Sequence, residues 1–206
     1  YISVHLRDES SSVIESVREV ITAAEQAKAN LKISHLKVRH SENWPLATDV
    51  LAEIEGAWHR GVNVHFDVYP YTSTWQPIYT YLPSWATMGG RLELLKQLKD
   101  PVQRAKILSA LNTSDSDIPQ LVIASTSSSL MVAGKTMSSI AAGFNTTSEE
   151  ALLNLIENGG SEILVFDNSL SEKVVNDFCD HALSFIATNG SGYSIQDTNK
   201  LIHPRC

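Results

Sequence analysis

Two histidines in this sequence lie at the ends of apolar segments and have the spacing of a shared metal site. His5 lies near the end of residues 1–6 and His35 near the end of residues 31–36, and both segments have the pattern of a β-strand. A single helical segment between them predicts parallel neighbouring strands, about 4.8 Å apart. Imidazole nitrogens are common zinc ligands. The pattern therefore predicts one metal ion between His5 and His35; the alternative is that both are ordinary polar residues at strand ends.

A cation follows each histidine two positions later. Arg7 follows His5 and Lys37 follows His35, so each cation is expected on the same strand face as its histidine. Guanidinium and ammonium groups bind carboxylates. The two cations are therefore candidates for holding an anionic group of a substrate, although solvated loop charges would give the same pattern.

Strands and helices alternate along the part of the chain that holds these residues. The spacing Ser12-x-x-Glu15 is that of a capping box at the start of a helix. A second helix is expected from residues 41–45 to Gly61, and a third strand over residues 62–69. Strands joined by helices in this way are expected to be parallel, with their carboxyl ends at one edge of a sheet.

The rest of the chain is less regular, but its final third alternates again. Residues 70–90 are expected to form a long aromatic loop, followed by two short helices with Asp100 capping the second. Further strands are expected at 121–124, 163–166 and 183–187, with helices opening at Thr147 and Ser169. The fold class is α/β, specifically part of a (β/α)8 barrel. Residues 1–206 are expected to be one fragment of such a barrel domain.

Composition excludes several kinds of function. Lys and Arg number 16 against 23 Asp and Glu, a formal charge of −7, and 43% of the residues are hydrophobic. Such a chain can bury a core, and its acidity argues against binding nucleic acid or an anionic membrane surface. The apolar runs are too short to predict a membrane span. Because the sequence begins within a predicted strand, we expect it to be a piece of a longer protein; its compartment stays open.

Several short segments occur in an order that resembles the N-acyl-D-amino-acid deacylase (D-aminoacylase) family of the amidohydrolase superfamily. The ordered set extends over nearly the whole chain, and no single segment carries the resemblance. The segments are YISVHLRDE at 1–9, ISHLK at 33–37, DVYPYT at 67–72, LPSWA at 82–86 with GG at 89–90, GKT at 134–136 and HPR at 203–205.

The resemblance implies a zinc-dependent barrel hydrolase that cleaves the amide bond of N-acyl-D-amino acids, with this chain supplying roughly the fifth to eighth strands. In the family, two histidines bind zinc, a lysine recognises the substrate carboxylate, the tyrosines of a Tyr-Pro-Tyr motif line the pocket, and an arginine lies in a His-Pro-Arg motif. The matching residues are His5 and His35, Lys37, Tyr69 or Tyr71, and Arg205.

One departure from the family puts catalysis in question. The catalytic aspartate of the family lies in a Ser-Asp-Gly segment, and the matching position here is Asn189 in Thr188-Asn189-Gly190. An amide cannot take a proton as a carboxylate does. Two other features also differ from the family. Val4 is one residue more than the usual Tyr-x-Ser/Thr-His spacing has before the histidine. The His-x-His and cysteine metal ligands, which lie on the first strands of the family's barrel, have no counterpart here.

Three interpretations therefore stay open. The first is a D-aminoacylase-like enzyme, whose Lys37 and Arg205 bind a small N-acyl amino acid. The second is a catalytically degenerate homologue that serves as a binding module. The third is a cyclic-amide hydrolase, which would not need Lys37. The fragment alone is expected to be nearly inactive and to associate with the missing half of the barrel or with itself, because its strand edges are unpaired.

Overall fold

The structure is a computed structural model that describes residues 1–114, 116–125, 132–159 and 163–190. The described residues form two compact units. Unit 1 comprises residues 1–73 and 169–190, and unit 2 comprises residues 74–168 apart from the gaps. Among the described residues, those of unit 2 thus lie between the two segments of unit 1.

A four-stranded parallel sheet forms the framework of unit 1. Its strands are β1 (Ile2–Val4), β2 (Leu31–Ile33), β3 (Val64–Val68) and β7 (Ser184–Ile186). They lie in the order β1-β2-β3-β7, and every neighbouring pair is parallel. The α/β class and the parallel arrangement are confirmed, whereas the barrel itself stays a prediction.

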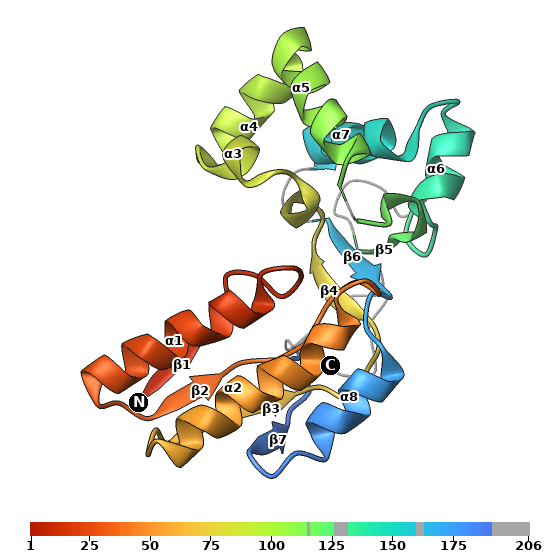
Figure 1. The fold of residues 1–206 in the computed structure, drawn as a ribbon. Helices are drawn as coiled ribbons and strands as arrows, with labels where there is room; N and C mark the ends of the chain where they lie inside the picture. The colour runs from red at the N-terminus through yellow and green to blue at the C-terminus, as the bar shows by residue number, and fades with distance from the viewer. Residues whose placement is uncertain (115, 126–131, 160–162, 191–206) are drawn as a thin grey trace. The chain divides into compact units, whose positions relative to one another are not determined.

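Helices cover one face of this sheet (Figure 1). They are α1 (Val13–Ala27), α2 (Ala47–His59), which the 3-10 turn η1 (Trp44–Leu46) precedes, and α8 (Glu172–Cys179). Alternate strand residues such as Phe66 are fully buried against helix residues such as Val17, Ile54 and Phe178. Since side chains alternate along a strand, Lys32 and His65 lie on the opposite face.

The start of α1 differs from the predicted capping box. Ser12 precedes the helix but makes no side-chain capping bond. Instead, Oδ1 of Asp8 accepts hydrogen bonds from the backbone N–H groups of Ser10 and Ser12, at 2.8 and 3.1 Å. The last helix also begins later than predicted, because Ser171 rather than Ser169 is its N-cap residue.

Unit 2 contains an antiparallel sheet with strand order β4-β6-β5. Its elements, in chain order, are β4 (Thr74–Pro77), η2 (Ile78–Tyr81), α3 (Ser84–Thr87), α4 (Gly90–Lys99), α5 (Pro101–Asn112), η3 (Ile118–Gln120), β5 (Val122–Ser125), α6 (Met137–Gly143), α7 (Ser148–Gly159) and β6 (Leu164–Asp167). The prediction of a loop over residues 70–90 is wrong, because Thr74–Pro77 pairs with Leu164–Asp167 far along the chain. The predicted Asp100 cap is confirmed, since Oδ1 accepts from the N–H groups of Val102 and Gln103.

The helices of the described ranges are short relative to a membrane span. None of the helices there is both long enough and apolar enough to cross a bilayer.

Candidate metal centre

His5 and His35 leave the same edge of the parallel sheet from adjacent strands. His5 is the first residue after β1, and His35 is the second residue after β2. Val4 is in register with Ile33, so the carboxyl ends of the two strands meet. The predicted neighbourhood of the two histidines is therefore present in the structure.

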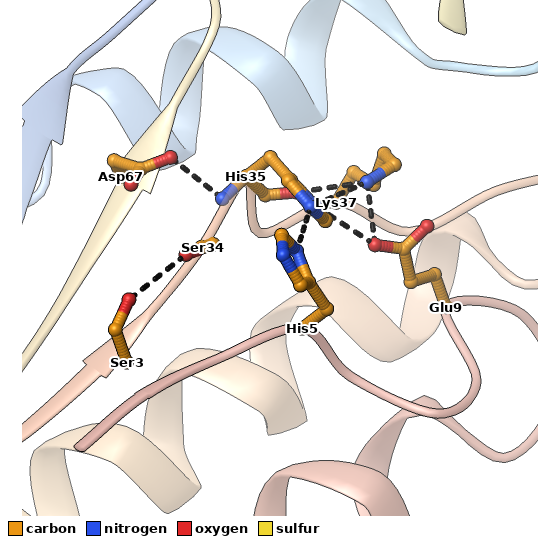
Figure 2. A network of polar contacts seen from close by, with 7 residues as sticks. All are labelled: Ser3, His5, Glu9, Ser34, His35, Lys37 and Asp67. Atoms are coloured by element: carbon orange, nitrogen blue, oxygen red, sulfur yellow. Dashed lines mark hydrogen bonds and ion pairs between the residues drawn. The ribbon is translucent and has the colours of Figure 1, made fainter. Parts of the chain in front are cut away.

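The two imidazole rings are stacked and present nitrogens to each other (Figure 2). Their centroids are 4.5 Å apart with an interplanar angle of 19°, and Nδ1 of His5 contacts Nε2 of His35. Two facing lone pairs repel each other unless a proton or a cation lies between them. This geometry brings one nitrogen of each imidazole to the same place at the sheet edge. The rings are in direct contact there, and two zinc–nitrogen bonds of about 2.0–2.1 Å would require the nitrogens to move apart.

Asp67, on the next strand, fixes the backbone at His35. Its Oδ1 accepts a hydrogen bond from the His35 N–H at 2.6 Å, and its backbone oxygen accepts from the N–H of Leu36 at 2.8 Å. The other carboxylate oxygen, Oδ2, pairs with the ammonium of Lys32. His35 has a φ of 42°, a left-handed conformation that is unfavourable for a residue with a Cβ. These contacts offset that cost and hold the backbone of His35 in place.

A carboxylate and an ammonium lie behind the His35 ring. Glu9 Oε1 is 3.1 Å from His35 Nδ1 and 2.5 Å from Lys37 Nζ. The Lys37 ammonium also lies 2.8 Å from His35 Nδ1 and donates to the His35 carbonyl at 2.9 Å. The side chains of Glu9 and Lys37 are only 15% and 8% exposed, so little water reaches this cluster.

Burial and charge act in opposite directions on Glu9. Burial raises the pKa of the Glu9 carboxyl, but the positive charge of Lys37 and the hydrogen bonds from His35 and Lys37 together lower that pKa below its ordinary value. Glu9 is therefore a carboxylate at neutral pH and acts as a hydrogen-bond acceptor.

The other predicted site residues occupy different surroundings. Tyr69 is buried beside Leu170 and Val175, with the Lys37 ammonium 5.7 Å from its ring centroid. Tyr71 packs against the same small cluster. The predicted pocket role of both tyrosines is untested.

Two predicted residues follow the last described strand. Asn189 is exposed, three residues after β7, and has a φ of 50°. β3 separates β7 from β2, which places their ends about 10 Å apart at the usual strand spacing. Arg205 lies outside the described residues.

Arg7 does not join the polar cluster around His35. Its guanidinium donates to Glu19 of α1 at 2.6 Å on the exposed surface. This contact fits the interpretation of Arg7 as a solvated charge rather than as a substrate ligand.

The sequence assigned no individual role to Glu9 or Asp67, which appear there only within the segments 1–9 and 67–72. Glu9 lies in a polar turn, and only the path of that turn brings it to His35. Asp67 carried a stronger signal: an acidic residue in a buried strand needs a partner. Its position on β3, beside β2, identifies the end of β2 as the place to look.

Two further polar motifs have structural roles. Thr136 of the Gly-Lys-Thr segment is the N-cap of α6 and accepts from the N–H of Ser139 at 3.2 Å. His65 packs between the rings of Trp58 and Phe185. Neither motif adds a ligand to the histidine pair.

The donor set fits zinc but is incomplete. Structural and catalytic zinc sites in proteins use three or four protein ligands. Within the part of the chain that the structure describes, no group of three or more His, Cys, Asp and Glu side chains could hold a metal ion. His5 and His35 can thus supply two ligands, and water or further residues would supply the remainder.

Comparisons with known proteins identify similar hydrolases. No family model matches the chain. An N-acyl-D-glutamate deacylase from Alcaligenes xylosoxydans xylosoxydans is 34% identical over 67 residues, which is 32% of this chain and 14% of that protein. These findings support the resemblance to the D-aminoacylase family that the short segments indicate.

Solved structures give the same result for the fold. An N-acyl-D-glutamate deacylase from Bordetella Bronchiseptica, complexed with zinc and a phosphonate inhibitor, matches with a TM-score of 0.67 and 18% identity over 91% of this chain and 32% of its own. A D-aminoacylase with a binuclear metal centre matches with a TM-score of 0.63 and 19% identity, over 90% of this chain and 31% of its own. The chain spans about a third of the length of each of these structures.

Proposed function

We propose that this chain carries part of the zinc centre of an amide hydrolase that acts on N-acyl-D-amino acids. The observation that carries the proposal is the convergence of His5 Nδ1 and His35 Nε2 at one edge of a parallel sheet. Similarity to zinc-containing deacylases supports the choice of metal and of reaction. In that reaction water adds across the amide bond and releases a carboxylic acid and a free D-amino acid.

The residues of this chain would bind and orient the reactants. His5 and His35 would hold the zinc, which when bound supplies a Lewis acid that activates water and polarises the amide carbonyl. Lys37 and Arg205 would hold the substrate carboxylate. Because the Lys37 ammonium already contacts Glu9, the substrate carboxylate would join or displace Glu9 there. Tyr69 or Tyr71 would line the substrate pocket.

A zinc titration of the 206-residue chain tests the metal site. We expect binding that His5→Ala or His35→Ala weakens at least tenfold, since each variant removes one of two ligands. His59→Ala is the matched control, because His59 lies on the exposed end of α2 and contacts only the Glu55 carbonyl among the described residues. Equal zinc affinity of the wild type and both variants would show that His5 and His35 do not form a metal site.

Hydrolysis assays test the reaction with the chain and with any longer protein that contains it. N-acetyl-D-amino acids and their L counterparts are the substrates, and release of the free amino acid is measured. We expect activity on the D series in a zinc-loaded longer protein and little in the chain alone. Activity confined to cyclic amides, unchanged by Lys37→Met, would favour the cyclic-amide hydrolase instead.

A noncatalytic binding module is the second candidate, and Asn189 favours it. An asparagine at this position could orient a water or ligand but could not accept its proton. The variant Asn189→Asp separates the two candidates. Hydrolysis that appears or increases at least tenfold in a zinc-loaded Asn189→Asp protein supports the scaffold of an enzyme, and no hydrolysis in either form supports the binding module.

The association state is a further part of this proposal. The outer strands β1 and β7 each have one neighbour among the described strands, and an unpaired strand edge favours association. We therefore expect the chain to bind either a second copy or the complementary part of a barrel.

A further inference from the structure

The His35 ring lies between two different partners. Its Nε2 contacts His5, and its Nδ1 is 3.1 Å from a carboxylate oxygen of Glu9. Figure 2 shows Glu9 approaching this cluster from the turn after β1, whereas His35 and Lys37 follow β2. A neutral imidazole carries only one ring proton. If that proton is on Nδ1, Nε2 has a lone pair that can bind a metal; if it is on Nε2, that nitrogen cannot bind one.

We propose that Glu9 is a positioning residue, which accepts the Nδ1–H of His35 and so directs the Nε2 lone pair toward the cation shared with His5. This inference rests on the proposed metal centre. A histidine that binds a metal commonly donates its second ring N–H to a carboxylate or carbonyl, which fixes the tautomer and the ring orientation.

Lys37 offers a competing arrangement. Its ammonium is 2.8 Å from the same Nδ1, and a hydrogen bond donated there would leave the ring proton on Nε2, where it would block metal binding. The charge of Glu9 favours the Glu9 arrangement, because an Nδ1–H donated to an ionised carboxylate makes a charge-assisted hydrogen bond. The ammonium then still has two acceptors, Glu9 Oε1 at 2.5 Å and the His35 carbonyl oxygen at 2.9 Å.

Burial makes the Glu9 contact consequential. The side chains of Glu9 and His35 are 15% and 14% exposed, so water can replace only part of a lost hydrogen bond. Lys37 balances the charge of the carboxylate, which lets Glu9 remain ionised beside the ring. The pair Glu9 and Lys37 therefore holds a carboxylate against His35 in a largely enclosed place.

Nitrogen NMR of the histidine rings in the zinc-free chain tests this proposal directly. We expect His35 in the Nδ1–H form in wild type, with its signals identified by their loss in His35→Asn. The double variant Glu9→Met, Lys37→Met removes the carboxylate and its counter-charge together, so no buried charge is left unpaired. In this variant we expect the Nδ1–H preference of His35 to disappear.

Zinc affinity provides the second measurement. We expect the dissociation constant to rise about 10- to 100-fold in Glu9→Gln and in the double variant, the range seen when such an outer partner is lost. Glu19→Gln is the matched control, because Glu19 is an exposed carboxylate in the same unit that pairs with Arg7, and its affinity should equal that of wild type.

The outcomes separate this inference from the proposed function. If wild type binds zinc and both Glu9 variants bind it within threefold, with His35 still in the Nδ1–H form, the role of Glu9 is overturned while the zinc centre stands. An Nε2–H form of His35 in zinc-free wild type also overturns it. If wild type binds no zinc, the proposed function fails. The position of the ring proton of His35, measured by NMR in the zinc-free chain, then still tests whether Glu9 accepts the Nδ1–H.

Discussion

A single carboxylate, that of Asp67, connects the strand next to β2 with the residue that carries the candidate ligand. Asp67 is 6% exposed and accepts from the backbone of His35, 32 positions earlier in the chain. The same side chain pairs with Lys32. Asp67 thus satisfies a backbone donor and neutralises a strand lysine while it holds His35 in a left-handed conformation.

Two substitutions at Asp67 separate these roles. Asp67→Asn keeps an oxygen that accepts from the His35 N–H but loses the ion pair with Lys32, whereas Asp67→Ala loses both. We expect Asp67→Ala to lower the free energy of unfolding by about 2 kcal/mol, because a buried donor is left unpaired, and to weaken zinc binding. Asp67→Asn should have the smaller effect on both quantities in urea unfolding and zinc titration; the reverse order would contradict this account.

The thiol of Cys179 lies at the end of α8. Burial raises the pKa of this thiol, and the charge of Asp180 raises it further. A raised pKa keeps the thiol protonated, and because the thiolate is the reactive form, alkylation should be slow at neutral pH. Any stabilisation from the neutral thiol is present below the pKa of the unfolded chain and is lost as the pH rises through the raised value.

This leads to a rate prediction that is made in a Cys206→Ser background, so that one thiol reacts. We expect iodoacetamide to label Cys179 at pH 8 more slowly in the folded chain than in urea, and the folded rate to keep rising above pH 9. Equal rates in the two states would show that the thiol titrates normally.

The spacing of His5 and His35 was sufficient to predict their pairing, because the position of each on its strand follows from the apolar pattern. Glu9 could not be placed in the same way. It lies in an irregular turn, and its contact with His35 depends on the route of that turn back across the strand ends. The sequence also suggested Lys37 as a substrate ligand, but it gave no indication that Glu9 pairs with it.

At the scale of the element, the turn before α1 shows how a local pattern can identify the wrong residue. Ser12 and Glu15 have the spacing of a capping box, yet the side chain that meets the backbone donors of this turn is Asp8. Asp8 lies further from the helix than a capping residue does. Its carboxylate reaches the N–H groups of Ser10 and Ser12 because the chain turns there before the helix begins.

A matched pair of variants tests this assignment. We expect Asp8→Ala to destabilise unit 1 by about 1 kcal/mol, the usual cost of removing a side chain that accepts from backbone donors at a helix start. Ser12→Ala removes a side chain without a capping bond and should be close to neutral. Hydrogen exchange of the amides in the first turn of α1 measures the effect of both variants. A larger loss of protection in Ser12→Ala than in Asp8→Ala would support the predicted capping box instead.

The first three strands of unit 1 were predictable because each lies beside a strand near it in the sequence and alternates with a regular helix. β4 was not, because its partner β6 begins only at Leu164. Aromatic residues and prolines after Tyr69 resemble a loop when no partner is known. The hydrogen bonds of β4 are made with β6, about 90 positions later in the chain, and a local sequence pattern contains no information about so distant a partner.

At the scale of the whole molecule, the described residues of unit 2, 74–168 apart from the gaps, are an insertion between two segments of unit 1. The two ends of unit 1 at the insertion are close, since the N–H of Leu170 donates to the carbonyl of Thr72 at 3.3 Å. The ends of unit 2 are also paired, since Thr74 is in register with Asp167. Each unit also has its own buried cluster of hydrophobic side chains.

We therefore expect that residues 74–168 can be replaced by a short Gly-Ser linker without loss of the histidine pair. The shortened chain should keep helical and strand circular dichroism and bind zinc within about threefold of the 206-residue chain, because a short loop costs little to close. The variant with His35→Ala in the shortened chain is the control for site-specific binding. Loss of zinc binding in the shortened chain, with the fold retained, would show that unit 2 supports the site.

The order of residues along the chain has a consequence for biosynthesis. His5, Glu9, His35, Lys37 and Asp67 all precede the insertion, whereas β7, which pairs with β3, follows it. A ribosome makes the N-terminal part of a protein first. The candidate ligands and the side chains that orient them therefore emerge before the last strand of their sheet exists, and a nascent chain that pauses inside unit 2 already carries both imidazoles.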